Sequence, residues 1–125
     1  MEIKKINVHP VLICKENDSV REVAQKLREH KERRIFVVDG ENKLNGLVTT
    51  TDLVYNALCD NCDKKVRDVM TKSVKSVDIT DNLENALEIM NEVKSFAFPV
   101  TDNGKILGII LYPELLSYVY KEIQK

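Results

Sequence analysis

Residues 35–52 read IFVVDGENKLNGLVTTTD, and this stretch decides the fold. Two apolar segments, Ile35–Val38 and Leu44–Thr49, flank an Asp39-Gly40 dipeptide that is typical of a turn between antiparallel strands. The first segment is apolar at every position, which is typical of a strand covered on both faces. The stretch therefore predicts a buried β-hairpin, followed by a helix that begins near Thr50.

The same pattern occurs a second time along the chain of 125 residues. Val11 aligns with Val74 at an offset of 63, and Gly46 aligns with Gly108 at an offset of 62 after a one-residue deletion. Few positions are identical, but the apolar pattern agrees throughout. Two copies of so small a unit would each bury little surface alone, so we expect a pair that shares one core.

Each copy begins with a short apolar segment, Val11–Cys14 or Val74–Val77, which predicts a strand. The next segments, Val20–His30 and Leu83–Val93, have apolar residues at the spacing of one helical face. Two pairs resemble capping boxes at the helix starts, one residue out of register with each other: Ser19 with Glu22, and Asp81 with Glu84.

The second copy has its own hairpin and its own final helix. Strands are predicted over Phe98–Thr101 and Ile106–Leu111, around an Asn103-Gly104 turn, and the helix begins near Tyr112. The predicted fold is α/β (α+β): two β-α-β-β-α repeats, residues 1–62 and 63–125, joined through Leu58–Lys65. We expect a pseudo-two-fold axis, with the two sheets packed together and the helices outside.

Charge and composition exclude several classes of protein. The 19 Lys and Arg residues are balanced by 20 Asp and Glu residues, which argues against a protein that grips nucleic acid or a membrane surface. No apolar run approaches the roughly 18–20 residues of a membrane span, and the N-terminus does not resemble a secretory signal. We therefore expect a cytoplasmic protein without a membrane partner.

The sequence carries no pattern typical of an enzyme. It has four glycines and neither the P-loop nor the dinucleotide-binding glycine motif. No nucleophile–base constellation and no paired catalytic carboxylates can be identified. We expect a binding protein with no obligatory cofactor.

The first candidate site follows the strand Leu44–Thr49. Thr49 closes the strand, and Thr51 and Asp52 lie in the first turn of the predicted helix, where backbone amides and the positive helix end meet. A carboxylate there can accept from both hydroxyls of a ribose, and threonine hydroxyls can donate to phosphate. The alternative is that these side chains only cap the helix.

Arg33 and Arg34 form the second candidate, directly before the strand Ile35–Val38. The planar guanidinium group matches paired phosphate oxygens. The alternative is a solvated charged run at the end of a helix.

The duplicated hairpins, together with VRDVMTKSV (residues 66–74) and GLVTTTD (residues 46–52), resemble a tandem pair of cystathionine-β-synthase (CBS) domains, a Bateman module. The resemblance covers essentially the whole chain, which implies a stand-alone module. It implies an adenosine-containing ligand, a regulated partner protein in trans, and homodimers assembled through the helices. It also implies ribose and phosphate contacts from Asp52, Thr49, Thr51, Arg34 and Arg33. The adenine slot it implies is lined by Leu47, Val74, Lys75 and Phe96, with Met70 nearby.

The second copy departs from this pattern. Leu111 and Glu114 stand where the first copy has Thr49 and Asp52, and Phe96 and Ala97 stand where it has the arginines. We therefore expect one nucleotide per chain, bound at the first copy. The arginines favour AMP, ADP or ATP over S-adenosylmethionine, whose sulfonium is positively charged.

Two other functions remain open. The chain could be a dimerising scaffold with a vestigial site. It could also use the Cys59-x-x-Cys62 pair for redox or metal chemistry, with Cys14 or His9 recruited by folding, although two thiols in a linker are no zinc site by themselves.

Overall fold

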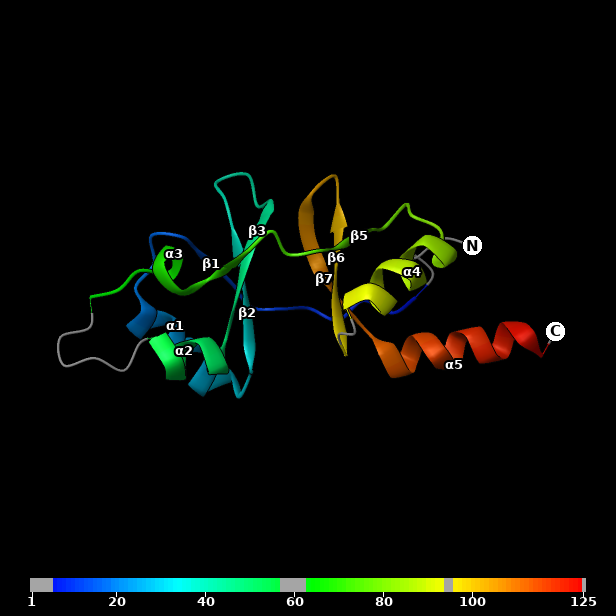
Figure 1. Ribbon diagram of the computed structural model, residues 1–125, viewed down its shortest axis with the longest axis horizontal. Coiled ribbons are helices and arrows are strands. Elements are labelled where there is room, and N and C mark those ends of the chain that lie inside the picture. The colour runs from blue at the N-terminus through cyan, green and yellow to red at the C-terminus, as the bar shows by residue number, and fades with distance from the viewer. Residues whose placement is uncertain (1–5, 57–62, 94–95, 125) are drawn as a thin grey trace. The chain divides into compact units, whose positions relative to one another are not determined.

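The computed structural model describes residues 6–56, 63–93 and 96–124 (Figure 1). The chain divides into two compact units. The central unit is Leu12–Val74, and the terminal unit is Lys75–Lys125 together with the segment that ends at Val11.

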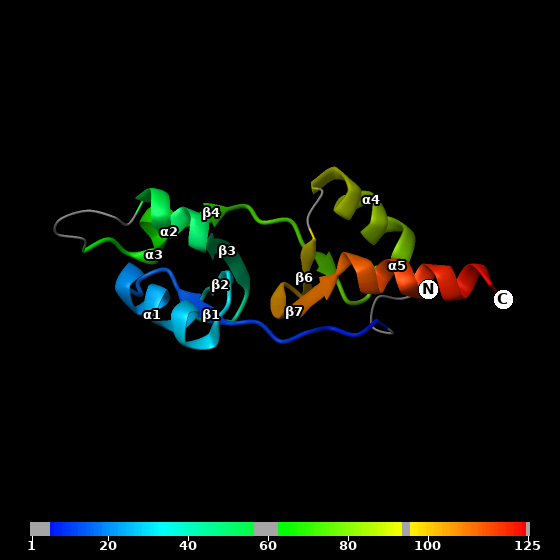
Figure 2. The ribbon, with the colours of Figure 1, turned by 90° about the horizontal axis from the view of Figure 1, so that it is seen from below.

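The central unit is a four-stranded sheet with helices on one side. The strands run in the order β1-β2-β3-β4, with β1 parallel to β2 and the other neighbours antiparallel. In both ribbon views, α1 and α2 lie on the same side of this sheet (Figures 1 and 2). The elements are β1 (Ile13–Lys15), α1 (Val20–His30), β2 (Arg34–Val38), β3 (Leu44–Thr49), α2 (Thr50–Asn56), α3 (Val66–Val69) and β4 (Thr71–Lys72).

The core of the central unit lies between the sheet and its helices. The buried face of α1 (Val20, Val23 and Leu27) packs into one cluster with Ile35 and Val37 of β2. Val66 of α3 is fully buried in the same cluster. A single apolar stripe on α1 therefore explains why this segment folds as a helix against the sheet.

The terminal unit repeats this plan with a three-stranded sheet in the order β5-β6-β7. Its core holds Phe98, Val100 and Ile110 from the strands and Met90 and Leu115 from the helices. Both helices lie on one side of the sheet in the two ribbon views (Figures 1 and 2). The elements are β5 (Val77–Asp78), α4 (Leu83–Val93), β6 (Ala97–Asp102), β7 (Lys105–Leu111) and α5 (Tyr112–Ile123).

Each unit contains a segment from the beginning of the other repeat. β4 pairs with β3 in the central unit, and His9 bridges to Ile109 of β7 in the terminal unit. We call residues 6–11 and 66–74 the lead-in segments. The two sequence repeats, 1–62 and 63–125, are thus each divided between the units.

The predicted fold class is confirmed: both repeats follow the order β-α-β-β-α. The helices Val20–His30 and Leu83–Val93 agree with α1 and α4 residue for residue. The strand predicted over Val11–Cys14 begins two residues later, at Ile13, and the one over Val74–Val77 begins at Val77. Val11 and Val74 end the lead-in segments, so pairing with β2 or β6 starts only beyond them.

Part of the predicted linker Leu58–Lys65 belongs to the central unit. Residues 57–62, which include Cys59 and Cys62, lie outside the described residues. Lys64 and Lys65 already belong to the central unit, because the Lys64 carbonyl accepts from the Val20 amide at 3.0 Å and Lys65 bridges to Ser19. The sequence analysis also missed α3 and β4, which are too short for a periodic pattern.

The N-caps correct one prediction and confirm another. Ser19 caps α1, since its hydroxyl accepts from the Glu22 amide at 3.0 Å. Asp81 does not cap α4: its carboxylate accepts from the Asp78 amide at 3.0 Å in the preceding turn. Asn82 takes the capping place and accepts from the Asn85 amide at 2.8 Å, which restores the register of the repeat.

None of the helices in the described part of the chain combines the length and the apolar character needed to cross a bilayer.

Candidate ligand-binding site

The antiparallel pairing of β2 with β3 brings the two predicted site clusters together. Arg34 is the register partner of Thr49, and the Thr50 amide donates to the Arg33 carbonyl at 2.9 Å. We call Arg33, Arg34, Thr49, Thr51 and Asp52 the first corner. Five residues from two separate sequence motifs thus meet where β3 runs into α2.

Thr49 and Asp52 cap the start of α2 reciprocally. The Asp52 amide donates to Thr49 Oγ1 at 3.2 Å, and the Thr49 amide donates to Asp52 Oδ2 at 2.8 Å. The Thr49 hydroxyl also lies 3.0 Å from Asp52 Oδ2. The capping function that the sequence left open is therefore real, and it fixes the orientation of the carboxylate.

The reciprocal cap leaves several polar groups of the first corner without a partner among the described residues. Within the described residues, Asp52 Oδ1 has no hydrogen-bond partner, and neither arginine side chain forms an ion pair or a hydrogen bond. Thr51 and Arg33 are exposed, whereas Arg34 and Asp52 are half-buried. A carboxylate oxygen, two guanidinium groups and a helix start are thus all open to an added ligand.

The predicted lining residues fall into both units. Leu47 and Met70 are half-buried in the central unit, where Leu47 pairs with Thr71, the residue after Met70. Val74 is half-buried at the end of the same unit. Lys75 and Phe96 belong to the terminal unit: Lys75 Nζ lies 3.4 Å from Glu92 Oε2, and Phe96 is 62% exposed.

The corresponding place in the terminal unit has the same backbone and different side chains. Ala97 pairs with Leu111, and the Tyr112 amide donates to the Phe96 carbonyl at 2.8 Å, as Thr50 does to Arg33. We call Phe96, Ala97, Leu111 and Glu114 the second corner. Leu111 stands at the N-cap of α5 and makes no side-chain cap hydrogen bond. Pro113 lies in the first turn of this helix, which needs no amide donor there.

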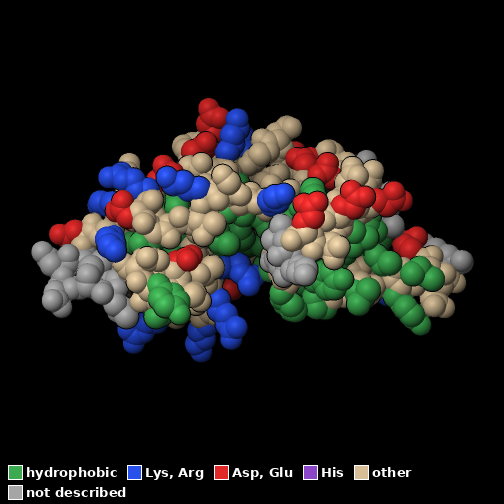
Figure 3. Space-filling view, in the orientation of Figure 1, with side chains coloured by type: hydrophobic (Ala, Val, Ile, Leu, Met, Phe, Trp, Pro, Cys, Tyr) green, Lys and Arg blue, Asp and Glu red, His purple; other side chains and the backbone are tan. Residues whose placement is uncertain are grey.

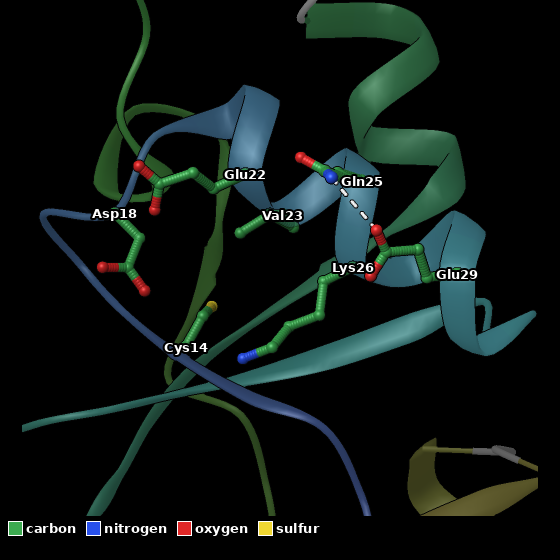
Figure 4. Close-up of a pocket in the computed structure, with 7 residues that line it drawn as sticks. All are labelled: Cys14, Asp18, Glu22, Val23, Gln25, Lys26 and Glu29. Atoms are coloured by element: carbon green, nitrogen blue, oxygen red, sulfur yellow. Dashed lines mark hydrogen bonds between the residues drawn. The ribbon is translucent and has the colours of Figure 1, made fainter.

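The sequence analysis missed a pocket of about 230 Å³ between α1 and β1 (Figure 4). Figure 4 shows the Cys14 sulfur directed at α1, with the Lys26 side chain beside it. Lys26 Nζ donates to the Ile13 carbonyl at 3.0 Å. The other residues that line the pocket are Asp18, Glu22, Val23, Gln25 and Glu29.

Cys14 is a buried core thiol that stays protonated near neutral pH. Burial raises the pKa of the Cys14 thiol to about 12, and the negative charge of Asp18 adds to this shift. The positive charge of Lys26 lowers the pKa and offsets part of the shift. A thiol must be deprotonated to attack or to bind a metal, so this side chain is inert near neutral pH. Among the described residues, no group of three or more His, Cys, Asp or Glu side chains could hold a metal ion.

Two curated relatives match almost the whole chain. A 17.7 kDa protein encoded in the bps2 3' region of Acidianus ambivalens is 30% identical over 115 residues, which are 91% of this chain and 70% of that protein. Protein YlbB of Bacillus subtilis is 31% identical over 91% of this chain and 79% of its own length. Other relatives are longer: the chain spans 40% of protein MJ1232 and 22% of the inosine-5'-monophosphate dehydrogenase, both of Methanocaldococcus jannaschii.

Solved structures have the same fold. CBSX2 in complex with AMP is 26% identical, with a TM-score of 0.75 over 99% of this chain and 98% of its own. The CBS domain pair of MJ0100, in complex with 5'-methylthioadenosine and S-adenosyl-L-methionine, is 24% identical with a TM-score of 0.72, over 98% of this chain and 97% of its own. The cytosolic domain of the Mg²⁺ channel MgtE, in complex with ATP, is 23% identical with a TM-score of 0.79, over 94% of this chain and 48% of its own. The last two likenesses concern the fold alone.

The sequence profile of the CBS domain matches this chain twice, at residues 3–58 and 66–121. The two matches contain the two hairpins, the two corners, all of α2 and most of α5. The chain belongs to the CBS domain family and carries two CBS domains in tandem.

Proposed function

We propose that this chain is a cytoplasmic regulatory module that binds an adenine nucleotide at the first corner. Its occupancy would be passed to a partner protein through a change in conformation or oligomeric state. The observation that carries the proposal is the meeting of two arginines, two threonines and a partly unused carboxylate at the start of α2. No catalytic step is part of this function.

The first corner matches the two ends of a nucleoside phosphate. Asp52 Oδ1 would accept from the ribose hydroxyls while Oδ2 keeps its bonds to Thr49. Arg33 and Arg34 would bind phosphate oxygens, since a guanidinium group can donate two parallel hydrogen bonds. A phosphate that leaves water needs such partners, or its burial costs several kcal/mol.

The adenine base would lie against apolar side chains close to this corner. Leu47, Met70 and Val74 are half-buried and suit that purpose. The AMP bound to the relative CBSX2 supports an adenosine ligand. The paired arginines favour AMP, ADP or ATP over S-adenosylmethionine.

A thermal-shift panel tests the proposal. AMP, ADP, ATP, adenosine and S-adenosylmethionine are added to the purified chain at increasing concentration. A ligand present at 100 times its Kd should stabilise the fold by about 2.7 kcal/mol, which raises the Tm by several degrees. Absence of any shift with all three nucleotides at millimolar concentration would refute the proposed function.

The arginines provide a sharper test of the phosphate contact. Arg34→Gln should weaken AMP binding about tenfold and leave adenosine binding within about twofold, because one charge-assisted contact is worth roughly 1.5–3 kcal/mol. Lys31→Gln is the matched control, since it removes an exposed cation from the same surface run. Equal losses for AMP and adenosine would mean that Arg34 does not bind phosphate.

The proposal includes a homodimer built through the exposed helix faces. Tyr112, Leu116, Tyr120 and Ile123 form an exposed apolar stripe along α5, between 45% and 71% exposed. Figure 3 displays hydrophobic side chains gathered over this helix. Light scattering of the chain and of Leu116→Glu tests the idea: the first should give a dimer and the second a 14.3 kDa monomer.

A dimerising scaffold is the second candidate. It is favoured by the reciprocal cap of Thr49 and Asp52, which gives both side chains a structural role without a ligand. In that case the chain dimerises but no adenosine compound shifts its Tm.

A further inference from the structure

The lead-in segment of residues 6–11 lies against β7 through a pair of backbone hydrogen bonds. The His9 amide donates to the Ile109 carbonyl at 2.8 Å, and the Ile109 amide donates back to the His9 carbonyl at 2.9 Å. A Cβ atom at Gly108 would lie only 2.1 Å from the His9 carbonyl oxygen, so glycine permits this close approach. Two backbone hydrogen bonds therefore fix the position of His9 along β7.

The His9 side chain reaches the start of α5. Its Nε2–H donates to the Glu114 carboxylate, with Nε2 at 2.9 Å from Oε1 and 2.8 Å from Oε2. The two side chains are 33% and 41% exposed. Both oxygens of this carboxylate are thus bound by the chain's own imidazole.

The first corner lacks such an occupant. Asp52 aligns with Glu114 in the repeat, and the partners of its carboxylate within the described residues all come from Thr49. The matching position of His9 in the other lead-in segment is Lys72, an exposed residue of β4. The two corners therefore differ in whether a lead-in side chain occupies the helix-start carboxylate.

We propose that His9 is an internal competitor that keeps the second corner closed to ribose-containing ligands. It binds the carboxylate oxygens that a ribose diol would need, and so it helps to restrict the chain to one ligand. The inference rests on the proposed function, since it carries the ribose contact of Asp52 over to Glu114.

The backbone pairing makes the imidazole an effective competitor. A tethered imidazole loses less translational and rotational freedom on binding the carboxylate than a free ligand does. Its two backbone hydrogen bonds hold the side chain next to Glu114 before any ligand arrives. Because a half-exposed side-chain contact of this kind is weak, removal of the imidazole should improve ligand binding at this corner by about threefold to fivefold.

The ligand that enters would carry no phosphate. The second corner offers the exposed rings of Phe96 and Tyr112, which are 62% and 45% exposed, and it has Ala97 in place of a phosphate-binding arginine. Aromatic faces suit a flat base, and Glu114 suits a diol. Adenosine is the appropriate probe.

The test uses the full chain with Asp52→Ala, so that ribose binding at the first corner is weakened. Adenosine is titrated calorimetrically into Asp52→Ala alone, with His9→Ala added, and with Lys72→Ala added as the matched control. We expect about threefold to fivefold tighter binding with His9→Ala, at one adenosine per chain, and no gain with Lys72→Ala. Addition of Glu114→Gln should remove the gain.

Equal adenosine affinity in the His9→Ala and Lys72→Ala backgrounds, with circular dichroism showing both folded, would overturn the proposal. Should His9→Ala unfold the chain, His9→Ser is used, because serine is too short to reach Glu114 and still keeps a polar group. AMP binding to the chain with its natural residues is measured in parallel. Its absence would refute the proposed function, whereas the effect of His9 is read from adenosine alone.

Discussion

The central and terminal units share one backbone plan and differ in the side chains at their corners. Each unit is a sheet with helices on one side, completed by a lead-in segment from the other repeat. The hydrogen bond from Thr50 to Arg33 has its counterpart in that from Tyr112 to Phe96. Duplication thus preserved the geometry, while exchange of four side chains and one lead-in histidine made the two corners chemically unequal.

The largest effect is expected when the chain is divided between its two repeats. Residues 1–62 alone should show no cooperative unfolding transition, because the fragment lacks Val66 and Val69, which are buried in the core of the central unit. It also lacks β4, which pairs with β3. Circular dichroism during urea titration provides the measurement.

Addition of residues 63–125 in equimolar amount should restore the transition, since the two fragments together contain every segment of both units. A cooperative, monomeric fold of residues 1–62 would contradict the exchange of lead-in segments.

The second-largest loss of stability is expected from alanine substitution of Gly108 and Gly46, which lie next to the lead-in segments. Gly108→Ala should destabilise the fold by about 3 kcal/mol, because a Cβ would meet the His9 carbonyl oxygen at 2.1 Å and the backbone must move. Gly46→Ala should cost about 1–2 kcal/mol, since its Cβ meets the flexible Met70 side chain and the Thr71 carbonyl at 2.9 Å.

Urea-induced unfolding measures both values, and Gly40→Ala is the control because a Cβ there meets no atom within 4 Å. A larger loss at Gly46 than at Gly108 would mean that the contact of residues 6–11 with β7 is weaker than that of β4 with β3.

The third effect separates binding from capping at the first corner. Asp52→Ala should weaken nucleotide binding at least about tenfold and remove the reciprocal cap, which costs about 1 kcal/mol of stability. Asp52→Asn keeps an acceptor for the Thr49 amide and should retain most of the stability, while the loss of charge still weakens binding.

Calorimetric titration and thermal unfolding are measured on the same samples. Glu114→Ala should change nucleotide affinity by less than about twofold, because that carboxylate is bound to His9. Nucleotide affinity that is unchanged in Asp52→Ala would assign the ligand to another part of the chain.

The smallest effect concerns Cys14, whose counterpart in the terminal unit is Val77. Burial raises the Cys14 pKa from 9.0 to about 12, so the folded state favours the neutral thiol. Its contribution to stability is complete below pH 9 and is lost as the pH rises toward 12. Cys14→Val should therefore reduce the fall in stability above pH 9.

Urea titrations at pH 7.5 and 10 compare the two proteins, and the difference between them isolates Cys14 from the other groups that titrate in this range. An identical decline in both would show that the thiol does not titrate on unfolding in the expected way.

Helices and strands that have a periodic pattern of their own could be predicted from the sequence. α1, α4 and β3 were identified residue for residue, because a helical stripe or an apolar strand depends on local residues. α3 and β4 have four and two residues and are stabilised by contacts with distant segments, such as the bond from the Arg67 amide to the Glu16 carbonyl at 3.0 Å. No local pattern encodes such contacts.

The hairpin turns illustrate the same limit on a smaller scale. Asn103 and Gly104 both have positive φ, at 52° and 83°, as the two-residue turn requires. In the first hairpin the left-handed residue is Asn42, at 66°, and Asp39 accepts from the Glu41 and Lys43 amides at 2.8 and 3.0 Å. The Asp39-Gly40 dipeptide marked a turn, but the extra residue of this copy made the loop longer.

The site residues remain a prediction, but the structure shows which of them lie together. Arg34 and Thr49 were singled out separately, and strand pairing makes them register partners. The reciprocal cap was one of two alternatives left open for Asp52. The contact between His9 and Glu114 could not be foreseen, because 105 residues separate them and neither belongs to a motif with the other.

The 105 residues between His9 and Glu114 affect how the chain folds as it leaves the ribosome. The central unit is complete in sequence once Val74 has been made, so it can fold while synthesis continues. His9 must wait until Glu114 emerges, which at 5–20 residues per second takes roughly 5 to 20 s. During that interval the lead-in segment of residues 6–11 has no partner strand, and a second nascent chain on the same message could supply its β7 instead.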